Sequence, residues 1–419
     1  MSDRGLPLWG KRPYPLLEMD EASRLIAAEV RPGGIFEATL AEAAGRVLAA
    51  DVTACEDYPA FDKALMDGFA VRAADCRTPG AELSVIGLAP AGRKTALHTV
   101  PGRAVRINTG APLPSGADAV VKIEETVVSG DGGIVRITTG VSAGQNVEPR
   151  GSIRPCGAAV LTAPVRIAPS HLAAAVTAGL RTLKVYERPG VAIVITGNEV
   201  VPAGQSKGPG QIHDSNGPML CALMSQFGAS PTPPTIALDT LDDLKDRFAK
   251  ALEKPVVLAC GGMSMGTLDL VPDALVELGV RWLMHGVSIR PGRPVAYGRG
   301  ADGQHVFGLP GNPISVFVCG WLFVRPVVDG LQGLPPIPPQ RVPATLVGEI
   351  KAHRDPRPAF VPARTWIDAS CGLMAEPCRW RGSADVYGAA EGTALLYVPR
   401  PREPIAAGSG VDVIVTSGT

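Results

Sequence analysis

VAIVIT (191–196) and PVVLAC (255–260) are two short apolar runs rich in β-branched residues, and each is followed by a loop and an amphipathic segment. Runs of this length and composition are typical of buried strands. A third strand is predicted near 234–238. The amphipathic segments predict helices at about 217–228, 241–252 and 270–279. Apolar strands that alternate with such helices indicate a parallel sheet covered on both faces, so this region is predicted to be α/β.

The chain on both sides of this region has a different pattern. Before it, the spacing of apolar residues predicts helices over 16–31, about 37–49 and 170–180. Short β-branched runs separated by Gly and Pro predict small β domains between 51 and 165. After it, a Pro-rich linker at 331–343 precedes a β-rich segment at about 344–419. The predicted fold class is therefore multidomain α/β plus β.

Composition excludes some classes of function. The 419 residues carry forty basic and forty acidic side chains, and this net charge of 0 argues against a nucleic-acid-binding protein. The N-terminus has no signal-peptide core, and no apolar run reaches the ~18–20 residues that span a bilayer, the longest lying near 313–328. The eight cysteines include no CxxC pair and are interpreted as buried thiols in a reducing compartment. A cytoplasmic location follows, with no nucleic acid or membrane as partner.

Three loops follow the predicted strands and the last apolar segment: ITGNEV (195–200), CGGMSMGTLD (260–269) and LPGNPIS (309–315). Open α/β sheets bind ligands at the carboxyl ends of their strands. The glycines of the second loop would let backbone amides approach an anion ahead of a helix. Each loop could also be only a turn followed by a helix cap, although three at one sheet edge favour a binding site.

Two acidic residues, Asp214 and Asp269, lie where a loop enters a predicted helix. An aspartate at such a position can simply cap the helix by accepting amide hydrogen bonds. Alternatively, the two carboxylates could hold Mg²⁺ between substrate phosphates, because hard oxygen ligands suit this ion. Spacing alone does not separate these alternatives.

The segment SIRPGRPVAYG (288–298) places Arg290 and Arg293 around a Pro-Gly turn. A guanidinium group suits a tetrahedral oxyanion, and Pro291 fixes the backbone beside it. The alternative is a solvated hairpin tip without a ligand.

Taken together, the motifs resemble the molybdopterin molybdenumtransferase family, which includes MoeA and the gephyrin E-domain. FDKALMDGFAV (61–71) is similar to the family's F-D-N-S-A-M-D-G-Y-A-V, and TGAPLPSGADAVVKIE (109–124) matches almost residue for residue. The remaining motifs follow in the family's order over nearly the whole chain: GQIHDSN (210–216), CGGMSMGTLD (260–269), RPGRP (290–294), GLPGNPIS (308–315) and GSADVYGAAEGTALLYVP (382–399).

The resemblance implies a fold of four parts. An elongated N-terminal helical and β region would comprise residues 1–50 and 150–182, with a small β domain inserted at 51–149. A MogA-like α/β domain with a mostly parallel sheet would follow at 183–330, and a C-terminal β barrel at 338–419. The resemblance also implies a homodimer, with a MogA-like adenylyltransferase and molybdoenzyme assembly factors as further partners.

The implied activity is a transferase reaction of molybdenum cofactor biosynthesis. The family inserts molybdate into adenylylated molybdopterin and releases AMP in a step that depends on a divalent metal, here expected to be Mg²⁺. Such chemistry needs a phosphate-binding loop, a carboxylate-held metal and an oxyanion pocket near the thiolates.

The resemblance also implies roles for residues of this chain. Asp214 and Asp269 would be catalytic and hold the metal or the adenylate, with Gly261, Gly262 and Ser264 in the phosphate-facing loop. Arg290, Pro291 and Ser315 match the molybdate-side loop of the α/β domain, and Arg364 and Ser383 match positions of the last domain. Asp62 and Thr109 match functional positions of the N-terminal half, which in the family reach the site from the other subunit.

Several positions depart from the family pattern. Asn198 stands where the family has an acid, Ser152 and Ile153 replace a glutamate–aspartate pair, and a family glutamate falls at His171. Arg290 replaces the lysine of K-P-G, Lys63 replaces an asparagine, and Gly286 falls where the family has a second lysine. A catalytically degenerate paralogue, which binds molybdopterin or the finished cofactor as a carrier, is therefore the alternative to the insertase.

Overall fold

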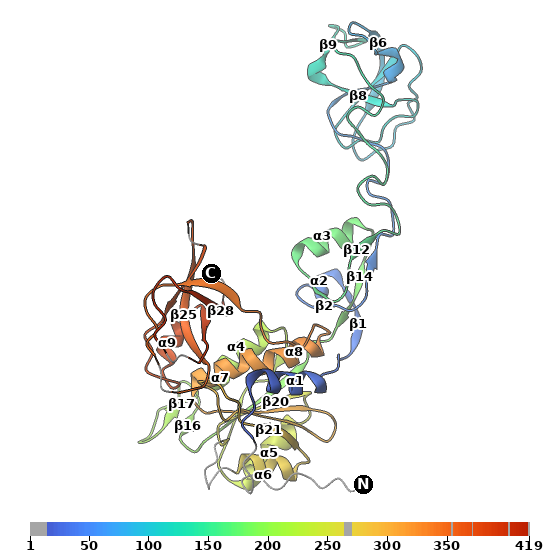
Figure 1. The fold of residues 1–419 in the computed structure, drawn as a ribbon. Helices are drawn as coiled ribbons and strands as arrows, with labels where there is room; N and C mark the ends of the chain where they lie inside the picture. Colours follow the sequence, from blue (N-terminus) through green and yellow to red (C-terminus); the bar gives the residue numbers. More distant parts are fainter. Residues whose placement is uncertain (1–14, 264–269, 353–354, 371, 401–402, 418–419) are drawn as a thin grey trace. The chain divides into compact units, whose positions relative to one another are not determined.

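The computed structural model describes residues 15–263, 270–352, 355–370, 372–400 and 403–417. The chain folds into two compact units (Figure 1). One comprises Met1–Phe36 and Tyr186–Thr419, and the other comprises Glu37–Val185. The apolar runs VAIVIT (191–196) and PVVLAC (255–260) therefore both lie in the larger unit.

The larger unit contains a seven-stranded sheet. Its strands in spatial order are β18 (Ser230–Pro231), β15 (Gly190–Thr196), β20 (Val256–Cys260), β23 (His305–Leu309), β22 (Ala296–Arg299) and β21 (Arg281–His285), with β19 (Thr235–Ala237) also paired to β15. The pairs of β15 with β18, β19 and β20, and of β20 with β23, are parallel. β22 and β21 continue the sheet in antiparallel pairing. The predicted parallel α/β sheet is confirmed, with an antiparallel edge that the sequence did not indicate.

Helices cover both faces of this sheet (Figure 1). The apolar core on one face includes residues from α1 (Met19–Glu29), α4 (Asn216–Gln226) and the helix that begins at Pro313. The core on the other face includes residues from α5 (Leu241–Ala251) and α6 (Val271–Glu277). Every residue of β20 is buried, as expected for a strand with helices on both sides.

One continuous helix runs from Pro313 to Leu331, formed by α7 (Pro313–Cys319), a π-helical segment (Gly320–Val324) and α8 (Arg325–Leu331). The sequence analysis expected no apolar segment long enough to span a bilayer. This helix corrects that expectation, because by length and composition it could cross a membrane. It continues through Arg325 and Asp329, whose side chains pair at 3.2 Å. Within its apolar 18-residue stretch, 83% is buried inside the protein, so it is a core helix of the α/β fold.

The end of the larger unit is a closed barrel, as predicted. Its strands in order around the barrel are β24 (Val342–Leu346), β26 (Gly372–Pro377), β25 (Ala359–Asp368), β27 (Ala394–Val398) and β28 (Gly410–Val415). A short helix, α9 (Val386–Ala390), precedes β27. Backbone hydrogen bonds tie the barrel to the α/β fold, since Arg290 N donates to Pro358 O at 2.9 Å and Phe360 N donates to Arg290 O at 2.8 Å.

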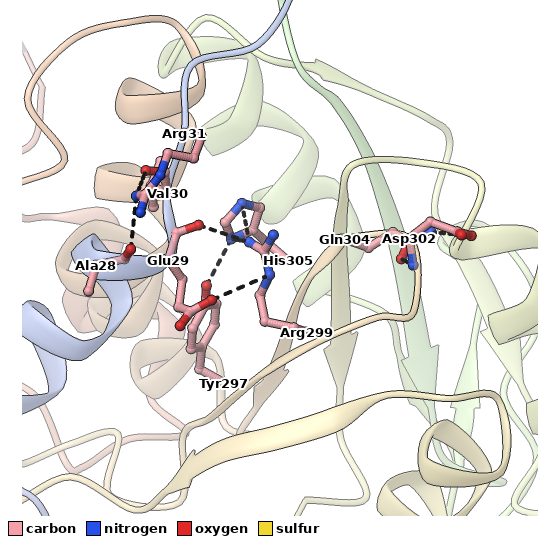
Figure 2. Close-up of polar contacts among 9 residues, drawn as sticks. All are labelled: Ala28, Glu29, Val30, Arg31, Tyr297, Arg299, Asp302, Gln304 and His305. Atoms are coloured by element: carbon pink, nitrogen blue, oxygen red, sulfur yellow. Dashed lines mark hydrogen bonds and ion pairs between the residues drawn. The ribbon is translucent and has the colours of Figure 1, made fainter. Parts of the chain in front are cut away.

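A buried polar cluster joins α1 to the strands β22 and β23 (Figure 2). The Arg299 guanidinium donates to Glu29 O at 3.2 Å and to His305 Nε2 at 2.6 Å. The hydroxyl of Tyr297 lies 2.9 Å from His305 Nδ1. Burial, together with the nearby charge of Arg299, lowers the pKa of His305 to about 3. The imidazole is therefore neutral at physiological pH.

The smaller unit is mainly β structure, as predicted for residues 51–165. Its six-stranded sheet has the order β8 (Ala119–Lys122), β5 (Gly68–Val71), β7 (Arg103–Ile107), β6 (Glu82–Ala89), β10 (Ile134–Ile137) and β9 (Thr126–Val128). A four-stranded sheet has the order β1 (Ile35–Thr39), β14 (Thr182–Tyr186), β2 (Val47–Leu48) and β13 (Val165–Arg166). Two short ladders pair β4 (Lys63–Ala64) with β11 (Val147–Glu148) and β3 (Val52–Thr53) with β12 (Ala159–Leu161).

The predicted helix at 170–180 is confirmed as α3 (Pro169–Thr177), but the helix predicted over 37–49 is wrong. Only Leu40–Ala43 is helical, and a capping box closes this single turn, since Thr39 N donates to Glu42 Oε2 at 3.0 Å. Val47 and Leu48 pair with β13 as a strand instead. Their apolar spacing mimics a helix, whereas sheet pairing decides their conformation.

Candidate functional site

The first cavity lies where three parallel strands end. β15, β20 and β23 finish at Thr196, Cys260 and Leu309. The loops that follow them line a cavity of about 910 Å³, to which the segment between β17 (Ile212–His213) and α4 also contributes. The three loops predicted to meet at one sheet edge therefore do meet there.

Gly261 and Gly262 form the turn that leaves β20, and the sequence predicted both in a phosphate-facing loop. Their φ angles are +99° and +60°, a region that favours glycine. A Cβ on Gly261 would lie 2.6 Å from the Thr196 carbonyl oxygen, so a larger residue does not fit there. The turn thus needs glycine for conformation and for close packing. The predicted site residues Ser264 and Asp269 lie outside the described residues.

Asp214 lines the cavity at the entry to α4 and is 9% exposed. Its Oδ1 accepts a hydrogen bond from the Gly217 backbone at 2.8 Å, so the carboxylate does cap the helix. The neighbouring Asn216 donates from Nδ2 to Gly311 O at 2.8 Å and joins α4 to the loop after β23. Its buried Oδ1 accepts no hydrogen bond from any described residue. Capping therefore uses one oxygen of Asp214.

Two further carboxylates, Glu199 and Asp239, line the same cavity. Asp239 is held by Asn198, because Asn198 N donates to Asp239 Oδ2 at 3.2 Å and Asp239 N donates to Asn198 Oδ1 at 3.1 Å. Within the described ranges, no group of three His, Cys, Asp or Glu side chains could hold a metal ion. A metal ion here would need ligands from outside those ranges or from the substrate.

A second cavity of about 370 Å³ lies beside the first, and both are lined by Pro294, Pro310 and Asn312. The predicted residues Arg290, Pro291, Ser315 and Ser383 all line it. Among the described residues of its wall, three are arginines and none is acidic. Arginine side chains and serine hydroxyls without a facing carboxylate suit a tetrahedral oxyanion.

The walls of this second cavity come from both the α/β fold and the barrel. Ser383 precedes α9 and is held against α7, since its Oγ accepts a hydrogen bond from Asn312 Nδ2 at 2.9 Å. Its carbonyl oxygen accepts a second bond, from Ile314 N, at 2.9 Å. Ser315 is only 4% exposed. The loop at Arg290 is bonded to the barrel through its backbone, so it is not a solvated hairpin tip, and it faces the barrel residues across the second cavity.

Arg357 is the arginine of this cavity that the sequence reasoning missed. Its Nε donates to Asp355 Oδ1 at 2.8 Å, and its Nη2 also pairs with Asp355. Its Nη1 donates to Ile289 O at 3.2 Å, beside Arg290. Hydrogen bonding to Arg357 lowers the pKa of Asp355. The carboxylate thus orients the guanidinium, which projects toward the Arg290 loop.

Arg364, which the sequence predicted at the anion, does not line the second cavity. It is on β25 directly across from Glu376 on β26, and its Nη2 donates to Glu376 Oε2 at 2.7 Å. Its side chain is 57% exposed, and it lines neither cavity. The barrel therefore supplies Arg357, seven positions earlier, to the second cavity.

Asp62 and Thr109 belong to the smaller unit. Asp62 Oδ1 accepts a hydrogen bond from Arg150 N at 2.8 Å. Thr109 N donates to Asp67 Oδ1 at 2.8 Å. Both residues are thus fixed in ordered loops beside β4 and after β7 of that unit.

Comparisons with known proteins identify the family. Residues 17–179 match a family model described as the MoeA N-terminal region, domains I and II, and residues 192–330 match a probable molybdopterin binding domain. The chain is 33% identical to a molybdopterin molybdenumtransferase of Staphylococcus epidermidis, over 90% of each protein. It belongs to the molybdopterin molybdenumtransferase family. A MoeA relative of Staphylococcus aureus, also named molybdopterin molybdenumtransferase, is likewise 33% identical over 90% of both chains.

Solved MoeA structures agree with this assignment. The molybdopterin biosynthesis MoeA protein from Pyrococcus horikoshii superimposes with a TM-score of 0.82 at 30% identity, covering 96% of this chain and 100% of that one. A second structure of a MoeA protein from this organism gives 0.80 at 28% identity. The chain is thus a MoeA-type transferase of molybdenum cofactor biosynthesis, and these relatives do not favour the carrier alternative.

Three of the departures from the MoeA pattern have local structural roles. His171 is at the third position of α3 and accepts a hydrogen bond from Ala168 N at 3.2 Å, which is the bond that a glutamate at this position would accept. Ser152 donates to Glu148. Gly286 has a φ of +90°, and an added Cβ would lie 3.2 Å from the Leu16 side chain, so a lysine would not keep this backbone without strain.

Proposed function

We propose that this protein inserts molybdate into adenylylated molybdopterin and releases AMP. The observation that carries the proposal is the pair of adjoining cavities at the carboxyl ends of the strands. The first has a glycine turn and carboxylates, and the second has arginines and serines. The proposed reaction needs these two environments side by side. One would bind the phosphoanhydride of the pterin substrate, and the other would bind molybdate close to the dithiolate.

The first cavity would bind the adenylylated pterin. In its glycine turn, Gly261 N donates to Leu309 O at 3.1 Å, so Gly262 is the residue of this turn whose amide is proposed to bind phosphate oxygens. A volume of about 910 Å³ is at the upper end of the range found for small-molecule sites, as a dinucleotide-sized substrate requires. The exposed ring of Tyr387 on α9 also lines this cavity and offers a flat surface for a planar ring of the substrate.

Mg²⁺ is the proposed metal of this cavity, and two oxygen groups among the described residues suit it as a partial ligand set. Asp214 and the unpartnered Oδ1 of Asn216 are hard oxygen donors at one end of the cavity. Asp269, which lies outside the described residues, is the further carboxylate proposed from the sequence. When bound, the ion would offset the negative charge of the phosphoanhydride. The chain itself contributes the glycine turn and the Asp214 carboxylate, which its hydrogen bond from Gly217 N holds in place.

The second cavity would bind molybdate, the second substrate. Arg290 and Arg357 would donate charge-assisted hydrogen bonds to its oxygens, and Ser315 and Ser383 would add neutral ones. Arg293 supplies a third positive charge on the same wall. Since Asn312 lines both cavities, an anion in the second lies next to a substrate in the first.

A homodimer is part of the proposal. The chain segment around Asp62 exposes four large apolar side chains, Tyr58, Phe61, Leu65 and Met66, each about two-fifths exposed. Exposed apolar groups gathered on one short segment are typical of a surface that another protein covers. A second copy of the chain would cover them and bring Asp62 and Thr109 to its site. A cytosolic location, expected from the sequence, is proposed with it.

The deciding experiment measures AMP release by the parent protein in the presence of adenylylated pterin, molybdate and Mg²⁺. Release that requires all three and exceeds a no-protein control is the expected result. If the protein binds the pterin yet releases no AMP above that control, the insertase proposal fails.

A further inference from the structure

Two cysteines outside the site lie against each other in the smaller unit. Cys55 follows β3, and Cys156 precedes β12, the strand that pairs with β3. Both are exposed free thiols, and the sulfur of Cys156 lies 3.3 Å from the carbonyl oxygen of Cys55. The expectation that the cysteines are buried holds for Cys260 and Cys319 but not for this pair.

The backbone around the two cysteines brings them opposite each other. Ala54 N donates to Ala158 O at 2.9 Å, and Gly157 N donates to Ala54 O at 2.8 Å. Gly157 has a φ of +82°, so it forms a β-bulge opposite Ala54. The next residues along the two segments are Cys55 and Cys156. Cys55 lies in a bend and Cys156 in a turn, and the Cys156 sulfur, 3.3 Å from the Cys55 carbonyl oxygen, lies against the backbone that carries the second thiol.

Neither cysteine uses its amide to bond the other. Cys55 N donates to Ala178 O, at the end of α3, at 2.9 Å. Cys156 N donates to Asp57 Oδ1 at 2.9 Å, and Asp57 is held in turn by Arg150 at 2.6 Å. Each amide therefore ties its cysteine to a neighbouring group, Ala178 O for Cys55 and the Asp57 carboxylate for Cys156. Their backbones are fixed on both sides, so rotation of the side chains is the main movement that a bond between the sulfurs requires.

We propose that Cys55 and Cys156 are a redox-active dithiol that forms a reversible intramolecular disulfide, a property separate from the transferase activity. The oxidant is a low-molecular-weight disulfide such as oxidised glutathione. One cysteine thiolate attacks it, releases one glutathione thiol and forms a mixed disulfide. The second cysteine thiolate attacks the protein sulfur of that mixed disulfide and releases the other glutathione. The protein loses two electrons and two protons, and two glutathione molecules are formed.

The disulfide would connect the two segments that lead to and from the six-stranded sheet. Between Cys55 and that sheet, residues 58 and 154 form an antiparallel bridge, and β4 pairs with β11. These contacts are few and short, so the covalent link would hold the segments together where the ladders are weakest. Exposed Arg150 lies within the closed loop and offers a cleavage site for trypsin.

The test uses the full-length protein equilibrated in glutathione redox buffers, quenched by alkylation and digested with trypsin. Tryptic peptides 47–63 and 151–166 each contain one of the two cysteines. We expect them to be joined by a disulfide, to an extent that does not change on roughly tenfold dilution of the protein, as an intramolecular step requires. In Cys156→Ser, the remaining thiol should instead retain glutathione at Cys55.

A second readout does not depend on peptide mapping. Limited cleavage at Arg150 should leave two fragments that stay together on a non-reducing gel after oxidation and separate on reduction. Cys221→Ser, which removes a half-buried thiol of the other unit, is the matched control and should behave like the parent. Glutathione on both cysteines without the cross-link, or a cross-link that survives in Cys156→Ser, would overturn the proposal.

Discussion

Substituting Arg357 with alanine gives the sharpest test of the second cavity. Arg357 is fixed by Asp355 and lines the cavity with Arg290, Ser315 and Ser383. A hydrogen bond to a charged group contributes roughly 1.5–3 kcal/mol, so the loss of one such contact should weaken molybdate binding roughly 10- to 150-fold. Arg357→Lys keeps the charge but loses the fork geometry, and its affinity should lie between those of alanine and arginine.

Arg364→Ala is the matched control, because it removes the same side chain from the same barrel. Arg364 is exposed, is paired with Glu376 and lines neither cavity. Molybdate affinity should therefore change by no more than about twofold. The loss of a distant positive charge is the only expected effect, and salt screens it. The sequence resemblance alone predicts the opposite, since it places Arg364 at the anion. The two single variants thus decide between Arg364, which the sequence resemblance predicts at the anion, and Arg357, which lines the second cavity.

Isothermal titration calorimetry with molybdate at constant ionic strength provides the measurement. Thermal unfolding of each variant shows whether the barrel is intact, which matters because Arg357→Ala removes the ion pair between Arg357 and Asp355. The assignment is refuted if a folded Arg357→Ala protein binds molybdate like the parent while Arg364→Ala does not. Equal loss in both variants would place the anion site outside the second cavity.

Three further predictions follow from other parts of the molecule. Asp214→Asn should lower molybdate-dependent AMP release by orders of magnitude. The free energy of unfolding should change little, because the side-chain oxygen of asparagine still caps α4. Unchanged AMP release would contradict a catalytic role for Asp214. The pKa of His305 is about 3 when folded and about 6.5 when unfolded, so below about pH 6.5 the unfolded chain takes up a proton that the folded chain does not. Stability should therefore fall as pH drops from about 6.5 toward 3, by up to about 1.4 kcal/mol per pH unit, and urea titrations of His305→Asn followed by tryptophan fluorescence should show a shallower dependence. Light scattering at micromolar concentration should give the mass of a dimer, and Phe61→Asp should shift it toward the monomer; a monomeric parent protein rejects the dimer.

The sequence predicted the α/β region well because burial on both faces leaves a simple signal. β15 and β20 are continuous apolar runs, and the predicted helices at 217–228 and 241–252 are α4 and α5 within two residues at each end. The helix expected over 37–49 failed for the opposite reason. Its apolar residues are divided between a four-residue helix and two strands, and only tertiary pairing decides between these conformations.

The residues that line the second cavity could not all be predicted from the sequence. Arg357 and Arg364 lie in the same barrel sequence, and only the pairing of β25 with β26 directs Arg364 toward Glu376. The bridge between Arg290 and Ala359 brings the start of β25, with Arg357 just before it, to the α/β loop. This contact joins residues about seventy positions apart, and no local pattern specifies it. Asn216 was missed for a similar reason, since its free oxygen is visible only once Gly311 is seen to bind the other side of the amide.

The loss of an acid at Asn198 does not by itself indicate a degenerate site. Asn198 and Asp239 exchange hydrogen bonds through both backbone and side chain, at 3.2 and 3.1 Å. An aspartate at position 198 could form both of these bonds, but it would place a second negative charge close to Asp239, and like charges at short range are unfavourable. The amide therefore accommodates a carboxylate on the adjacent loop, and Asp239 lines the first cavity in its own right. Glu199 and Asp239 give this wall acidic character without an acid at position 198, so this substitution by itself does not support the carrier alternative.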